Sequence, residues 1–157
     1  SLPRGKGISC FLVEKETLGL SISKAEEKMG QQASATNEVV FENCRIPKDA
    51  LMGKLNQGFK VAVSELAGGR IGIGSLALGV GLAAMDFARD YIAERQQFGQ
   101  PIINFQGIQW MMAEAYTDLE ASRLLLMNAA DTKEKGLPFS KQASMAKLFA
   151  SEKSSAT

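Results

Sequence analysis

The chain of 157 residues is long enough for a globular domain with a sizeable core, and its 45% hydrophobic and 22% charged residues are typical of a folded protein. Eighteen basic against seventeen acidic residues leave a net charge of +1, so we expect neither nucleic acid nor an anionic membrane surface as a partner. The absence of histidine removes the commonest general base and the commonest metal ligand, and no metal site is expected.

Cysteine usage and hydropathy bear on the cellular compartment. Cys10 and Cys44 lie in apolar, strand-like stretches without metal-type pairing, which indicates buried free thiols in a reducing compartment. The most apolar region, residues 71–84, is too short and too rich in glycine to cross a bilayer. We therefore expect no membrane span.

Residues 1–52 have the pattern of strands and loops. Residues 8–13 form an apolar run of strand length that is compatible with burial on both faces, and residues 19–23 alternate between apolar and small polar side chains. Residues 38–44 mix β-branched, aromatic and charged side chains, as in a further strand. Residues 30–37 are small and polar, which predicts a loop.

After residue 58 the hydrophobic period becomes helical. We predict helices from there to the end of the sequence, with breaks near Gly68 and Gly69, at residues 97–101 and at residues 135–138. The predicted core face of the first helix carries Leu76, Val80, Ala83, Ala84, Phe87 and Tyr91.

The second and third helices follow the same period. Glu120 and Arg123 are spaced as an ion pair on the wet face of the second helix, and Gly136 is expected to end it. Ser140 is the predicted N-cap of the third helix. The predicted core positions of the two helices are Ile108, Met111, Met112, Ala115, Leu119, Leu126, Ala130, Ala143, Ala146 and Leu148.

The pattern as a whole predicts an α+β protein. The third helix runs to Thr157 without a stop signal, and the first strand starts almost at residue 1. We therefore expect a piece of a larger protein, with residues 1–52 from the end of a β-domain and residues 53–157 forming the first antiparallel helices of an incomplete helical domain.

A glycine motif raises the possibility of dinucleotide binding. Gly72, Gly74 and Ala77 match the Rossmann pattern Gly-x-Gly-x-x-Ala, which needs a strand before it and an acidic residue on a second strand about twenty positions later. Glu94 has the right distance but ends a helical pattern, so we favour close backbone approach as the role of the glycines. A strand over residues 61–66 with a parallel partner would restore the Rossmann interpretation.

The segment from Arg95 to Gln106 contains an arginine, two phenylalanines, a glycine and a proline between two helices. One interpretation is a plain turn, in which Gly99 and Pro101 break the helix and Phe98 fills the core. The other is a ligand site, because a guanidinium fork binds phosphate or carboxylate groups bidentately. The segment alone leaves both open.

The wider sequence resembles the acyl-CoA dehydrogenase family, and especially its short-chain and branched-chain members. The pattern Arg-x-x-Phe-Gly-x-Pro-Ile-x-x-x-Gln starts at Arg95, and residues 28–30, 39–47 and 58–62 match further family segments in the same order. The resemblance covers essentially the whole chain. It implies the end of a middle β-domain, barrel-like or sandwich-like, followed by helices of a four-helix-bundle domain.

The resemblance also implies an activity. Such a parent enzyme binds FAD, α,β-desaturates a short- or branched-chain acyl-CoA and passes electrons to an electron-transfer flavoprotein. It assembles as a dimer of dimers, since the flavin site spans subunits. The expected location is the cytoplasm of a bacterium, which we favour, or the mitochondrial matrix of a eukaryote.

Two groups of residues match the binding positions of the family. The positions that reach FAD, with Arg95 on the diphosphate of a flavin bound mainly by a neighbouring subunit, are Arg95, Gln97, Phe98, Phe105 and Gln106. The positions that line the acyl-CoA site are Ala67, Gly68, Gly69 and Arg70. Many family members have aspartate in place of Ala67, so any polar contact of that aspartate is absent from this chain.

No catalytic residue is assigned. The family reaction needs a carboxylate base, which most members place in a C-terminal segment and some place immediately before the arginine equivalent to Arg70, where this chain has Gly69. Glu65 lies five residues before Arg70, which is not the alternative position. We expect the isolated chain to be inactive. The alternative to an enzyme is a non-catalytic helical module for packing or oligomerisation, which would bind no flavin.

Overall fold

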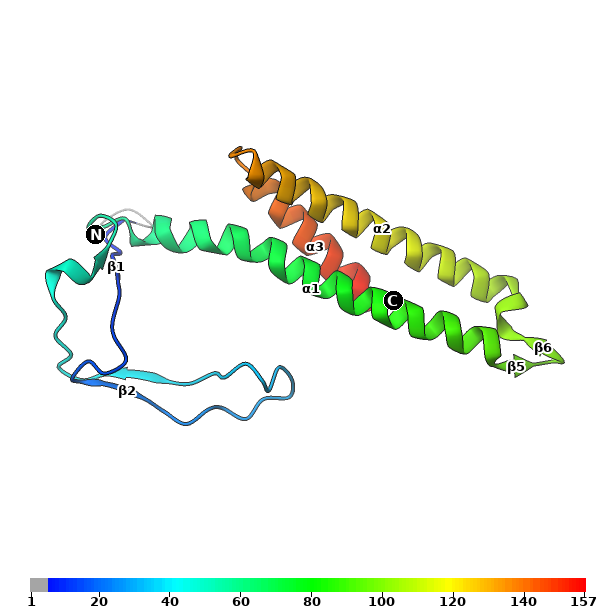
Figure 1. Ribbon diagram of the computed structural model, residues 1–157, viewed down its shortest axis with the longest axis horizontal. Helices are drawn as coiled ribbons and strands as arrows, with labels where there is room; N and C mark the ends of the chain where they lie inside the picture. The colour runs from blue at the N-terminus through cyan, green and yellow to red at the C-terminus, as the bar shows by residue number, and fades with distance from the viewer. Residues whose placement is uncertain (1–5) are drawn as a thin grey trace. The chain divides into compact units, whose positions relative to one another are not determined.

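The computed structural model describes residues 6–157 (Figure 1). The chain divides into two units, Ser1–Ala62 and Val63–Thr157, and the boundary falls inside the first helix, α1 (Gly58–Glu94). The first unit contains short strands and loops, and the second is helical. Both parts of the predicted α+β architecture are therefore present.

The first unit holds two small antiparallel ladders. β1 (Cys10–Phe11) pairs with β4 (Leu51–Met52), which follows the 3-10 turn η1 (Lys48–Ala50), and β2 (Leu20–Ile22) pairs with β3 (Val39–Phe41). The strands are shorter than the sequence pattern suggested.

The predicted burial of residues 8–13 on both faces is wrong for this structure. Only Cys10 and Phe11 are in a strand, and the side chains of Ile8, Phe11 and Leu12 are exposed. A two-stranded ladder has no second layer to cover its apolar side chains. The free thiols of Cys10 and Cys44 are half-buried rather than buried. The predicted loop at 30–37 is confirmed, since it has neither helix nor strand.

Three helices dominate the rest of the chain: α1, α2 (Gln106–Glu134) and α3 (Ser140–Ala156). The predicted breaks at 97–101 and 135–138 are confirmed, but the break near Gly68 and Gly69 is wrong, because α1 continues through both. Each glycine costs a helix about 1 kcal/mol relative to alanine, which packing of the helix offsets. Residues 61–66 are helical, so the Rossmann interpretation is also wrong.

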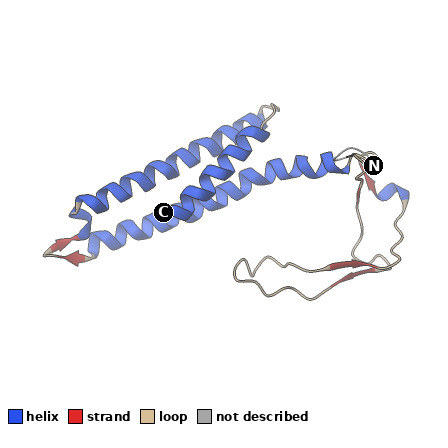
Figure 2. Ribbon diagram, turned by 180° about the vertical axis from the view of Figure 1, so that it is seen from behind, coloured by secondary structure: helices blue, strands red, loops and turns tan. Residues whose placement is uncertain are grey.

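Two glycines set the register of the second unit. A Cβ atom built on Gly74 would lie 2.7 Å from Leu126 Cδ2 and 3.4 Å from Lys147 Cα. Seven residues later, a Cβ on Gly81 would lie 2.7 Å from Leu119 Cδ2 and 3.0 Å from Ser154 Oγ. The partner numbers fall by seven on α2 and rise by seven on α3. Hence α1 runs antiparallel to α2 and parallel to α3, as Figures 1 and 2 show.

The buried side of α1 is not the face that hydrophobicity predicted. All six of its predicted core residues are exposed: Leu76, Val80, Ala83, Ala84, Phe87 and Tyr91. The core instead uses α1 positions at alternating four- and three-residue spacing, with Ile92 a further seven residues on: Ala67, Ile71, Gly74, Leu78, Gly81, Met85 and Ile92. Small residues let the helices approach closely, and a search for bulky apolar side chains overlooks such a stripe.

The core of the second unit includes most of the predicted positions on α2 and α3. The buried cluster comprises Leu78, Met85, Leu119, Leu126, Ala129, Ala146 and Ala150, and Met112 and Ala115 pack against it. Ala143 is buried as well. Met111, Ala130 and Leu148 are exposed, so these three core predictions are wrong. They lie next to the buried stripe rather than on it.

The connection between α2 and α3 is a glycine-capped turn. Gly136 has φ +68°, and its N–H donates to the carbonyl of Lys133 at 2.9 Å, while the N–H of Leu137 donates to Thr132 at 3.1 Å. These two hydrogen bonds form a Schellman motif, which confirms the prediction that Gly136 ends α2. Ser140 is the first residue of α3, not its N-cap; Phe139 occupies that position without a side-chain cap.

By length and composition alone, α1 could cross a membrane. Its most apolar 18-residue window has a mean hydropathy of 1.7, and 22% of that window is buried. A core helix of a soluble protein passes the same test, so one such helix is weak evidence. The high mean hydropathy of α1 arises because the helix has two adjacent apolar faces, and one of them packs against α2 and α3. The absence of a membrane span stays a prediction.

Candidate cofactor and substrate site

The segment between α1 and α2 is a small β-hairpin rather than an irregular turn. Arg95 directly follows α1, and its N–H donates to Tyr91 while its carbonyl accepts from the N–H of Ile102. β5 (Gln96–Gln97) then pairs antiparallel with β6 (Gln100–Pro101). The 3-10 turn η2 (Ile102–Asn104) leads to Phe105, the N-cap of α2.

The tip of this hairpin is strained and exposed. Phe98 and Gly99 have φ +52° and +78°, which is the two-residue turn that best fits the twist of a hairpin. Glycine adopts this conformation freely, whereas it is unfavourable for a phenylalanine. The Phe98 side chain is also 92% exposed, so core packing does not explain it. Strain of this kind is common where a side chain is held for a ligand.

The five predicted cofactor residues lie together on this hairpin and the start of α2. The rings of Phe98 and Phe105 meet edge to face, with centroids 6.1 Å apart and an interplanar angle of 87°. The guanidinium of Arg95 is exposed, and none of the ion pairs among residues 6–157 involves it. The side-chain amides of Gln97 and Gln106, in the same segment of the chain, are also exposed. A free guanidinium, an aromatic face and two amides fit a dinucleotide such as FAD.

The four predicted substrate residues lie in the interior of α1. Ala67 is 6% exposed and turned towards the helical core, which leaves its side chain little surface for a ligand. Gly69 is exposed, with nothing within 4 Å of a Cβ built there, and Arg70 is half-buried. Contacts with a bound molecule would thus come mainly from Gly69 and Arg70.

Two lysines that the sequence analysis did not single out lie against this stretch. A Cβ on Gly68 would be 3.2 Å from Lys133 Nζ, which also sits 5.8 Å from the centroid of the Phe139 ring. Lys147 of α3 borders the same face of α1 as Gly69 and Arg70. Only the register set by the glycines places these lysines here, so sequence spacing alone gave no signal.

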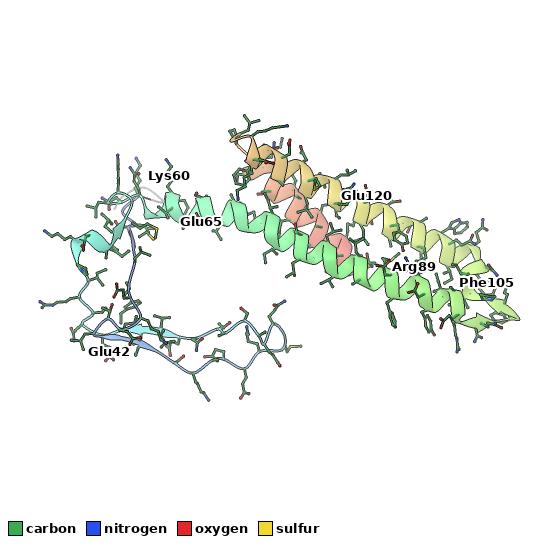
Figure 3. All side chains as sticks on the ribbon, viewed as in Figure 1. Glu42, Lys60, Glu65, Arg89, Phe105 and Glu120 are labelled. Carbon is green, nitrogen blue, oxygen red and sulfur yellow. The ribbon has the colours of Figure 1, made fainter. Side chains whose placement is uncertain are left out.

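The two groups of residues lie far apart, one within α1 and the other beyond its C-terminal end. Arg95 follows Arg70 by 25 residues and comes directly after the end of α1, and at about 1.5 Å per helical residue this is roughly 37 Å. Figure 3 shows Glu65, five residues before Arg70, and Phe105 at opposite ends of the helical unit. The structure therefore gathers the cofactor residues in one place and the substrate residues in another.

Comparison with known proteins identifies the family. Residues 56–156 match the model of the acyl-CoA dehydrogenase C-terminal domain. The chain belongs to the acyl-CoA dehydrogenase family. The resemblance seen in the sequence is thereby confirmed over most of the chain, including the helices and the hairpin that carry the candidate residues.

Individual acyl-CoA dehydrogenase relatives cover nearly the whole chain. The mitochondrial short/branched chain specific acyl-CoA dehydrogenase of Rattus norvegicus is 48% identical over 147 residues, which is 94% of this chain and 34% of that protein. Acryloyl-CoA reductase (NADH) of Anaerotignum propionicum is also 48% identical over 147 residues, covering 94% and 37%.

A solved structure has the same fold over nearly the whole chain. Butyryl-CoA dehydrogenase from Megasphaera elsdenii superposes with a TM-score of 0.90 at 40% identity, over 95% of this chain and 39% of that one. The chain thus spans between about a third and two fifths of the length of these relatives.

Proposed function

We propose that this chain is part of an FAD-dependent acyl-CoA dehydrogenase that α,β-desaturates a short- or branched-chain acyl-CoA and passes the electrons to an electron-transfer flavoprotein. The observation that carries the proposal is the match to short/branched-chain relatives at 48% identity across 94% of the chain, including the hairpin with its free arginine. The parent would work as a dimer of dimers in the cytoplasm of a bacterium or in a mitochondrial matrix.

The roles of the chain's own residues follow from the geometry. Arg95 would hold the diphosphate of FAD through a charge-assisted fork, and the edge-to-face pair of Phe98 and Phe105 would offer an aromatic surface beside it. Gln97 and Gln106 would donate to and accept from hydroxyl or base edges. FAD, when bound, supplies the hydride acceptor. Gly69 and Arg70 would border the thioester substrate.

A second function has a specific observation in its favour. Acryloyl-CoA reductase (NADH) of Anaerotignum propionicum matches over the same length and with the same identity as the rat dehydrogenase. A parent that reduces an enoyl-CoA at the expense of NADH would use the same residues for FAD and for the thioester.

The test uses the full-length protein that contains this chain. Purified protein with bound FAD is mixed anaerobically with butyryl-CoA or 2-methylbutyryl-CoA, and flavin bleaching is followed with and without an electron-transfer flavoprotein as acceptor. Rapid bleaching and reduction of the acceptor support the dehydrogenase. Flavin reduction by NADH followed by reoxidation with acryloyl-CoA supports the reductase. A colourless protein that binds no flavin supports the packing module instead.

A further inference from the structure

A small hollow on the second unit combines an apolar floor with two cations. It has a volume of about 230 Å³ and is lined by Leu66, Gly69, Arg70, Ile73 and Lys147. The α1 residues are spaced at three and four positions and share one face of that helix. Leu66 and Ile73 are 60% and 55% exposed, and Lys147 reaches the hollow from α3.

Neither cation has an acidic partner in the part of the chain that the structure describes. The ion pairs among residues 6–157 involve Arg89, Arg123, Lys135 and Lys153, and not Arg70 or Lys147. Both side chains are half-buried. An anionic group that lies beside two positive charges without a counter-ion is attracted by both of them.

The hollow lies on a face that further polypeptide of the full-length protein can cover. Butyryl-CoA dehydrogenase from Megasphaera elsdenii is matched over only 39% of its length, so relatives contain much more polypeptide that can pack on this face. An apolar floor bordered by two positive charges is complementary to a segment with apolar side chains around one carboxylate. The hollow is about the size of a few side chains rather than of a whole ligand.

We propose that Lys147, together with Arg70, forms an ion pair with a carboxylate side chain from a segment of the full-length polypeptide outside residues 6–157, and that this pair fixes the segment over Leu66 and Ile73. The inference does not depend on the direction of the redox reaction, and it assigns Lys147 a positioning role that the substrate prediction for Arg70 did not include.

The test is zero-length carbodiimide coupling of the full-length protein, which joins an amine to a carboxylate as an amide while the carbodiimide takes up the water as a urea. Peptide mass spectrometry should find Lys147 coupled to an aspartate or glutamate outside this chain, in a band of monomer size. Coupling to Glu65 or another acid of residues 6–157, or in a dimer-sized band, would overturn the proposal.

Thermal unfolding of variants gives an independent measurement. Lys147→Gln should lower Tm by about 2–4 °C at low salt and by less at high salt, and Lys147→Glu should lower it further. Lys147→Arg should keep most of the stability. The matched control is Lys141→Gln, at an exposed position of the same helix, which should leave Tm unchanged. If Lys147→Gln weakens CoA binding without changing Tm or coupling, the cation serves the ligand and the proposal fails.

Discussion

Arg70 lies within α1 and Arg95 directly follows the last residue of that helix, which puts them roughly 37 Å apart at about 1.5 Å per helical residue. Both are predicted to serve one reaction, the first at the thioester and the second at the diphosphate of FAD. A rigid helix holds them at this separation in every copy of the chain. The distance therefore favours an assembly in which each reaction centre takes its Arg95 from a neighbouring subunit.

Mixing two inactive variants tests this arrangement. We expect Arg70→Ala and Arg95→Ala, each purified as a full-length homo-oligomer, to have little activity. If the centre spans subunits, mixed oligomers contain some centres with both arginines intact, because one subunit supplies Arg70 and the other Arg95. Random pairing at equal amounts should restore about a quarter of the wild-type centres.

The control for the mixing experiment is a single double variant. Arg70→Ala combined with Arg95→Ala in one chain, mixed with either single variant, should restore no activity, since no centre then receives both arginines. Recovery that never rises above the two parents, although subunit exchange is seen by mass, would mean that one subunit supplies both residues.

Arg95 is also expected to matter for FAD retention more than for folding. Its guanidinium is exposed and has no ion pair among residues 6–157, so Arg95→Ala should change the unfolding free energy little. A charge-assisted pair of hydrogen bonds to a diphosphate contributes about 2–3 kcal/mol, which corresponds to roughly a 30- to 150-fold weaker Kd for FAD.

Two variants make the Arg95 measurement specific. Arg95→Lys should recover only part of the affinity, because one ammonium cannot reproduce the planar fork. Arg89→Ala removes a cation from the same end of α1, where Arg89 pairs with Asp86 and Asp90 at 3.0 Å, and it should leave the Kd for FAD unchanged. Equal dissociation constants for wild type and Arg95→Ala, measured by flavin fluorescence, would exclude the cofactor role.

Parts of this structure were accessible from the sequence because they depend on local chemistry. The stop at Gly136 and the Glu120–Arg123 pair follow from backbone and i,i+3 rules. The face of α1 did not follow, because α1 is apolar on two adjacent sides and only the packing partner decides between them. The break expected at Gly68 failed for a similar reason: tertiary packing overrides a weak local preference.

The candidate site also combines features that local sequence predicts with features that depend on tertiary packing. The residues around Arg95 could be predicted to lie close together because they belong to one motif of twelve residues, Arg95 to Gln106. Lys147 was not found, because 77 residues separate it from Arg70 and only the helix register brings them to one hollow. The strained φ of Phe98 was also invisible, since the pattern Phe-Gly is compatible with several turns.

Replacing two glycines of α1 by alanine should change the stability of the chain in opposite directions. A Cβ at Gly81 would lie 2.7 Å from Leu119 Cδ2 and 3.0 Å from Ser154 Oγ, and Leu119 is only 1% exposed and has no room to move. Gly81→Ala should therefore destabilise the 157-residue chain by about 1–3 kcal/mol through overpacking. Gly79→Ala, where nothing lies within 4 Å, should stabilise it by roughly 0.5–1 kcal/mol. Urea unfolding of both variants provides the comparison, and equal shifts would contradict the register.

Glu120 and Arg123 give a pH-dependent signature of the folded second helix. The Arg123 guanidinium donates two hydrogen bonds to the Glu120 carboxylate, at 2.7 and 2.8 Å, and holds the pKa of that carboxyl below its usual value. The stabilisation is therefore fully present above the ordinary glutamate range and is lost as the pH falls through the lowered pKa.

The pKa of Glu120 can be followed by carbon NMR of its side-chain carboxyl. In Arg123→Gln it should rise towards the value of an unpaired glutamate, whereas Arg89→Gln, which acts on a different pair, should not move it. Both groups of the Glu120–Arg123 pair are well exposed, so the shift should shrink as salt is added. An unchanged titration in Arg123→Gln would rule out the pair in solution.

The isolated 157-residue chain is expected to lack acyl-CoA dehydrogenase activity even when saturated with FAD and butyryl-CoA. The sequence has no histidine, and Gly69 stands where some relatives are expected to carry the glutamate. Without a base at the α-carbon, proton abstraction loses a factor of about 10²–10⁴ from general-base catalysis, and the positioning by the missing part of the site is lost as well.

Single-turnover bleaching of the flavin under anaerobic conditions measures this directly. The informative variant is Gly69→Glu, which places a carboxylate on the exposed side of α1, where a Cβ meets nothing within 4 Å. Glu65→Gln is the control, because Glu65 is the nearest carboxylate upstream of Arg70 in the sequence. Bleaching by the unmodified chain at the rate of an intact family member, abolished by Glu65→Gln, would show that Glu65 is the base and that the alignment around Gly69 is wrong.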